Sequence, residues 1–157
     1  MTTWLRMVLV LTLVGGGFAG FSFTLAGLFS PQIEGLSAKI LAAAFLGLYG
    51  FVVWAGLAFV HDPTRRSPLY AALGLQAAWI STPLISYHMW SGALISVGLH
   101  SGTLQFVANF GASWYFSFGK PEVAGLGLNL FAIALLVLLY HADRIDDEIR
   151  RAKLAFD

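Results

Sequence analysis

The sequence predicts an all-α integral membrane protein whose four transmembrane helices form a compact bundle. Hydrophobic residues make up 58% of the 157 residues and charged residues only 11%, and the mean hydropathy is +0.77. Water-soluble globular proteins are about 45–50% apolar and about 25% charged, so this chain carries too few charges to cover a soluble surface. Four of its stretches are apolar over the roughly 20 residues that a helix needs to cross a bilayer.

The four predicted helices cover residues 4–29, 38–60, 68–99 and 121–142 of a single domain, 1–157. The third stretch has about 32 residues, fewer than the roughly 40 that two crossings and a turn require. One tilted helix is therefore expected there, with a kink at Pro83. The segment 100–120 is rich in aromatic residues and is expected to lie along the outer membrane interface.

The distribution of basic residues predicts the orientation of the bundle. With four crossings, seven basic residues share one side and two lie on the other: Arg6, Arg65, Arg66, Arg144, Arg150, Arg151 and Lys153 against Lys39 and Lys120. By the positive-inside rule both termini are cytoplasmic, in a bacterial-type inner (plasma) membrane. The fourth helix is expected to continue into the cytoplasm as a helical tail, 143–156, because Asp146–Arg150 and Asp147–Arg151 are favourable acid-first pairs.

Small residues on one side of each helix predict where the helices pack. Membrane helices approach closely at such positions because lipid tails are as apolar as leucine and offer no hydrophobic drive for association. The predicted packing glycines are Gly16, Gly20, Gly27, Gly47, Gly50, Gly74 and Gly92. The opposite, aromatic-rich faces are expected to contact lipids or other integral membrane subunits.

His88 is the ionisable residue that falls most clearly inside a predicted span, and such residues are candidates for function. It is either a neutral histidine that donates one hydrogen bond across the bundle, a proton-handling group, or an axial ligand of a b-haem or a chlorophyll-type pigment. His61 and His141 close the second and fourth helices at similar depth and form a candidate haem pair. On one helix, His88 and His100 would be about 18 Å apart, too far to share an iron.

Several function classes lack their chemistry in this sequence. Without cysteine there are no disulfides, thiolate nucleophiles, iron–sulfur clusters or Cys-ligated zinc. A net charge of +1 provides no basic field for nucleic acid. No phosphate-binding Gly-rich loop, H-E-x-x-H or G-x-S-x-G motif occurs, and the interiors of the predicted spans contain no Asp or Glu for a proton relay.

These observations favour a non-catalytic accessory subunit of a larger inner-membrane complex, of respiratory or photosynthetic type, with bound lipids. The alternative is an electron-transfer or pigment subunit that binds haem or a chlorophyll-type ring. A third hypothesis, a small transporter or channel, rests on the polar residues of the third predicted helix.

Overall fold

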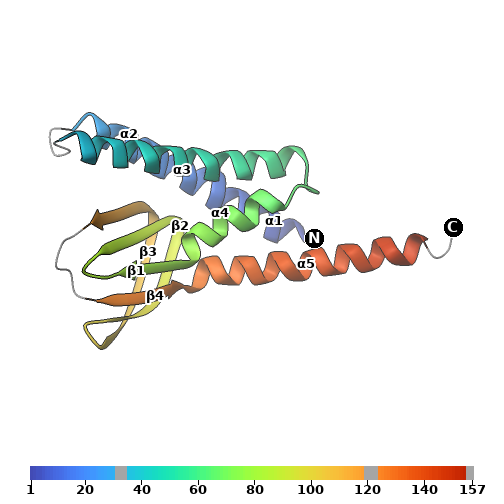
Figure 1. Ribbon diagram of the computed structural model, residues 1–157. Coiled ribbons are helices and arrows are strands. Elements are labelled where there is room, and N and C mark those ends of the chain that lie inside the picture. The colour runs from blue at the N-terminus through green and yellow to red at the C-terminus, as the bar shows by residue number, and fades with distance from the viewer. Residues whose placement is uncertain (31–34, 119–123, 155–157) are drawn as a thin grey trace.

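A computed structural model describes residues 1–30, 35–118 and 124–154, and it combines long helices with an antiparallel sheet (Figure 1). The first helix is continuous but changes pitch at a π-helical segment, η1. In chain order the elements are α1 (Thr3–Val10), η1 (Leu11–Gly16), α2 (Gly17–Leu28), α3 (Leu36–His61), α4 (Ser67–Ala77), β1 (Ala78–Ser81), β2 (Ile85–His100), β3 (Thr103–Phe118), β4 (Gly125–Asn129) and α5 (Leu130–Leu154).

The predicted all-α four-helix bundle is wrong, because the third predicted helix, 68–99, does not exist. Its residues form the short helix α4, then β1 and nearly all of β2. Between Ile85 and Met89 large apolar or aromatic residues alternate with Ser86 and His88, and this period of two is typical of a strand rather than a helix. Aromatic and β-branched residues, frequent in this stretch, also fit a pleated surface well.

The C-terminal half differs from the prediction in a second way. The segment expected along the interface, 100–120, forms β3 up to Phe118, and its last two residues lie outside the described part of the chain. The helix expected from residue 121 begins at Leu130, after β4. From there α5 continues without a break to Leu154, so the expected tail is helical as far as the structure describes it; its cytoplasmic location stays a prediction.

The sheet has the strand order β1-β4-β2-β3, with an additional pairing of β1 with β2. β2 pairs with β3 over its full length, from Ile85↔Phe118 to His100↔Thr103. Its other edge pairs with β1 near its start and with β4 near its end. Because β1 and β4 also pair with each other, these three strands close a small ring, and β3 is the outer strand.

Two glycines let the long β2–β3 hairpin bend. Gly92 and Gly111 lie opposite each other, and both have positive φ angles, +80° and +119°. Residues with a Cβ rarely adopt such angles. The ends of the two strands are joined at Ser101 and Gly102, also with positive φ, as in the tight turns that match strand twist. In Figure 1 the hairpin curves across the end of the molecule where the strands gather.

The helices cover one face of the sheet. α2 and α3 form an antiparallel pair, and α4 descends from the end of α3 towards β1 while packing against α5 (Figure 1). The core lies where these layers meet and contains fully buried Leu9, Leu13, Tyr49, Leu73, Met89 and Leu139.

Two helical stretches, Thr3–Leu28 and Leu36–His61, are long and apolar enough to cross a membrane, with mean hydropathies of 1.9 and 2.1. Length and composition alone are weak support for a membrane location, because a buried core helix can have both. Large apolar side chains are nevertheless exposed on every layer, for example Phe18 on α2, Trp54 on α3, Phe110 on β3 and Leu138 on α5. Exposed apolar surface of this extent is typical of membrane or protein contacts.

Candidate functional site

The two faces of the β2–β3 hairpin have different neighbours, because side chains alternate along a strand. Tyr87 and Met89 point to the helices. Their neighbour on β3, Trp114, stacks on Phe45 of α3 with ring centroids 4.4 Å apart and donates its indole N–H to the Thr24 hydroxyl, 2.9 Å away. Ser86, His88 and Trp90 therefore occupy the opposite face.

On that opposite face, β1, β2 and β3 surround a cavity of about 250 Å³. Its polar lining consists of Ser81, Ser86, His88, Ser96, His100 and Gln105. Its aromatic lining consists of Trp79 and Tyr115. Tyr87, whose hydroxyl donates to the Leu75 carbonyl of α4 at 2.7 Å, also borders the cavity. None of its lining residues in the described chain is Asp, Glu, Lys or Arg, so the cavity is polar without carrying a fixed charge.

His88 and His100 both line the cavity, whereas one helix would have separated them by about 18 Å, too far to share an iron. They lie near opposite ends of β2, yet both line the same space. The bend at Gly92 accounts for this, since a straight strand would rise about 3.3 Å per residue and would separate them widely. The separation that a helix would impose on the two histidines therefore does not hold in this structure.

Trp79 forms one wall of the cavity and packs against three glycines, Gly98, Gly125 and Gly127. A Cβ atom added at Gly127 would be 2.4 Å from Trp79 Nε1, and one added at Gly98 would be 2.5 Å from its Cζ2. Gly125 makes a similar approach at 3.1 Å. Without side chains at these positions the indole can lie against β4 and β2, where its N–H donates to the Ser96 hydroxyl at 2.8 Å.

His88 lies between two tryptophans, with ring centroids 5.9 Å from Trp79 and 4.6 Å from Trp90. Its Nε2 and the Trp90 Nε1 are buried and have no hydrogen-bond partner among the described residues. Two adjacent unsatisfied ring nitrogens are unusual, because buried polar groups are nearly always hydrogen-bonded.

The other candidate haem ligands lie elsewhere. His61 is exposed at the end of α3 and lines a cleft with Trp54 and Asp62. His141 is exposed on α5, where its ring is 6.0 Å from that of Tyr140. α4 packs against both α3 and α5 and lies between them, so it separates the helices that carry the two histidines.

The predicted packing glycines divide into two groups. Three make close approaches: a Cβ at Gly16 would be 2.1 Å from the Gly92 nitrogen, one at Gly92 would be 2.9 Å from Thr12 Cα, and one at Gly20 would be 2.3 Å from Tyr49 Cε1. Gly16 thus packs against a strand rather than a helix. A Cβ at Gly47 or Gly74 would meet nothing within 4 Å, one at Gly50 would reach only Phe21 at 3.9 Å, and Gly27 is half-buried.

Buried amides connect the helices to the strands. Gln76 of α4 accepts hydrogen bonds through Oε1 from the Ser91 backbone N–H and hydroxyl, at 2.7 and 2.9 Å. Asn129 Oδ1 accepts from the backbone N–H groups of Phe131 and Ala132, which is the usual bonding of a helix N-cap. The same oxygen also accepts from the Ile95 N–H of β2 at 3.3 Å.

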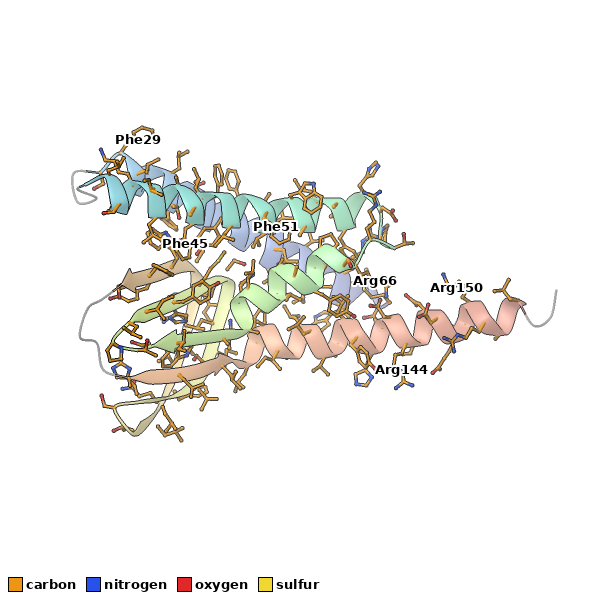
Figure 2. The ribbon with its side chains drawn as sticks, viewed as in Figure 1. Phe29, Phe45, Phe51, Arg66, Arg144 and Arg150 are labelled. Carbon is orange, nitrogen blue, oxygen red and sulfur yellow. The ribbon has the colours of Figure 1, made fainter. Side chains whose placement is uncertain are left out.

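A second polar cluster lies at the opposite end of the molecule and joins α4 to α5. Arg66 pairs with both Asp143 and Asp146, and the Tyr70 hydroxyl donates to Asp143 at 2.5 Å. The N-terminal ammonium of Met1 adds a contact to Asp146 at 3.3 Å. Hydrogen bonds from Arg66 and from that ammonium lower the pKa of Asp146. Figure 2 places Arg66 between α4 and α5, beside a cleft of about 770 Å³.

Sequence reasoning singled out His88 but missed most of its surroundings, namely Trp79, His100 and the three glycines that Trp79 packs against. A signal was present, since Gly125 and Gly127 alternate with leucines in Gly-Leu-Gly-Leu, and glycines two apart fall on one face of a strand. The Arg66 cluster was also missed: Asp146 was assigned to Arg150, whereas Arg150 pairs with Asp147 at 3.4 Å.

Among the described residues no group of three or more His, Cys, Asp or Glu is placed to hold a metal ion. Comparisons of the chain with models of protein families, with curated proteins and with solved structures found no match.

Proposed function

We propose that the protein is a membrane-embedded, non-catalytic subunit of a larger inner-membrane assembly, and that a partner subunit covers the outer edge of β3. The observation that supports this proposal is the position of β3. It is a sixteen-residue outer strand that lies beside the two helices long enough to cross a bilayer.

One contact between β3 and these helices is made far from the helix ends. The Tyr49 hydroxyl, near the middle of α3, is 2.7 Å from the Ser113 carbonyl oxygen and 3.0 Å from that of Trp90. A bilayer has a hydrocarbon core about 30 Å thick, and a spanning helix of 26 residues places its middle near the centre of that core. The second half of β3 would then lie at membrane depth.

A strand edge at that depth needs a partner. In an antiparallel pair, alternate residues direct their backbone N–H and C=O groups towards and away from the neighbouring strand. β3 pairs with β2 but with no other described strand, so half of these groups point to its outer edge. Each group left unsatisfied in hydrocarbon costs several kcal/mol, and open sheet edges exposed to lipid do not occur. Protein from another subunit would remove this cost.

The side chains near this edge fit an apolar partner. Leu104, Phe106 and Phe110 are 70%, 67% and 88% exposed. An aqueous surface would leave this apolar area in water at a cost of roughly 25 cal/mol per Å². Contact with an apolar membrane subunit would bury it instead.

The charge distribution supports a cytoplasmic location for both termini. Arg6 of α1 donates to the Val60 carbonyl at the end of α3, and Figure 2 places Arg66, Arg144 and Arg150 towards the same end of the molecule, with Phe29 at the other. Basic residues gathered at one end follow the positive-inside pattern, even though the sheet replaces the predicted third crossing.

The test is mild solubilisation of native membranes, followed by native electrophoresis and identification of stoichiometric partners. Phe110→Ser, at the β3 edge, should reduce recovery of the complex, whereas Phe23→Ser, a matched change at an exposed position of α2 (69% exposed), should not. A wild-type chain that extracts as a monomer, or only as a dimer of itself, would overturn the proposal. Equal loss in both variants would overturn the role of the β3 edge.

A further inference from the structure

We propose that the cavity between β1, β2 and β3 binds the ring of a quinone-type lipid, a neutral planar head group with carbonyl oxygens and an apolar tail. This inference concerns the face of the hairpin that lines the cavity and does not depend on what covers the outer edge of β3.

The lining determines the charge of the ligand. The described residues around the cavity include imidazole, indole, hydroxyl and amide groups but no carboxylate, ammonium or guanidinium. An ionised ligand would lose its hydration there without gaining a counter-charge, which is costly. A neutral ligand with polar atoms is therefore favoured.

The aromatic walls of the cavity favour a ligand with a flat ring. Trp79 packs against its three glycines, and its indole N–H donates to the Ser96 hydroxyl. These contacts fix the orientation of the indole ring. His88 lies close to it, and Tyr115 is directly opposite His88 on β3. Aromatic walls of this kind favour stacking with a planar partner.

The polar groups favour an acceptor on that ring. His88 and His100 line the cavity from opposite ends of β2, and Gln105 adds an amide. Since the His88 Nε2 has no hydrogen-bond partner among the described residues, rotation of the imidazole towards the cavity breaks no bond at that atom. A carbonyl oxygen on the ligand can accept from a neutral imidazole N–H or from the amide.

The size of the cavity and the residues at its rim determine where the rest of the ligand lies. A volume of about 250 Å³ is below the roughly 300–1,000 Å³ of pockets for drug-sized molecules, so it suits one substituted ring rather than a whole lipid. Ile80, Val107 and Tyr115 at the cavity are each 40–44% exposed. This largely apolar rim lets a tail pass to the surrounding lipid.

The test is titration of the purified protein in detergent with a benzoquinone that carries a medium-length alkyl chain. Quinones quench tryptophan fluorescence on contact, and Trp79 and Trp90 lie beside the site. Saturable quenching is expected. His88→Phe keeps an aromatic ring but removes the donor, and should weaken binding about tenfold, the equivalent of one lost hydrogen bond. His141→Phe, the same change at an exposed site on α5, should leave binding unchanged.

His100→Phe provides a second variant if His88→Phe does not fold, as judged by its thermal unfolding, and it should also weaken binding. The alkylbenzene with the same chain should bind far more weakly than the quinone. The proposal is overturned if the alkylbenzene binds equally well, since the cavity would then accept any apolar chain. Non-saturable quenching that is identical in the wild type and both cavity variants would also overturn it.

Discussion

The two faces of the β2–β3 hairpin differ in how completely their polar and apolar groups are matched. On the face towards the helices, Trp114 is stacked and hydrogen-bonded, and the Tyr49 hydroxyl reaches two strand carbonyls. On the other face there is a cavity, and two ring nitrogens, of His88 and Trp90, lack partners in the described chain.

This difference separates what stabilises the fold from what is available for binding. Close-packed groups with satisfied hydrogen bonds contribute most to stability. Natural proteins retain unsatisfied groups and empty volume mainly at functional sites. Substitutions on the face towards the helices should therefore cost stability, and substitutions on the cavity face should cost binding.

The largest effect is expected where η1 meets the bend of the hairpin. Gly16→Ala places a Cβ 2.1 Å from the Gly92 nitrogen, and two backbones must separate to accommodate it. We expect little or no folded protein by size-exclusion chromatography after extraction. Gly47→Ala adds the same atom where nothing lies within 4 Å and should leave the yield and melting temperature close to those of the wild type. Normal folding of Gly16→Ala would show that this contact is not tight.

Removal of the Phe45 ring is expected to be the next most costly change. Phe45 is 2% exposed and stacks on Trp114, so Phe45→Ala should lower the free energy of unfolding by about 3–5 kcal/mol. Tyr115→Ala, on the cavity face where the ring is 44% exposed, should cost clearly less. Thermal unfolding in detergent measures both, and equal losses would contradict the distinction between the two faces.

Single polar atoms should show the same contrast on a smaller scale. Tyr49→Phe removes the hydroxyl near two carbonyl groups and should cost about 1–3 kcal/mol, the range for leaving buried polar groups unsatisfied. His88→Phe removes an unpartnered nitrogen and should be neutral or slightly stabilising. A marked loss of stability in His88→Phe would indicate that the imidazole has a structural role.

The smallest effect concerns the Arg66 cluster and depends on pH. Because the pKa of Asp146 is lowered in the folded state, its contribution is complete above the unfolded pKa of about 3.9 and is lost as the pH falls through the folded value. At pH 7, Asp146→Asn should cost at most about 1 kcal/mol, since the side chain is 37% exposed. Melting temperatures of the two proteins should converge at acid pH; a constant difference would exclude this linkage.

The sequence predicted the continuous apolar helices well and the sheet not at all. Composition and length identify 36–61 as a helix, because its Ala, Leu and Gly content suits a long apolar helix. The stretch 68–99 is also long and largely apolar, but it is more polar than 36–61 and contains the alternating residues around His88, whose period of two is the local sign of a strand. The pairing of β4 with β1 and β2, and of Arg66 with Asp143, depends on contacts between distant segments, which local patterns do not reveal.

The junction of β4 and α5 has a mechanical consequence. The strand passes into the helix without a loop, and Asn129 ties the first turn of α5 to β2. Strand and helix therefore act as one lever with its fulcrum at Asn129. On the long arm, the Arg66 partners Asp143 and Asp146 lie about 20 and 24 Å from Leu130 at 1.5 Å per residue. The short arm carries Gly125 and Gly127 beneath Trp79, so a tilt of the charged end would be transmitted, reduced in amplitude, to the wall of the cavity.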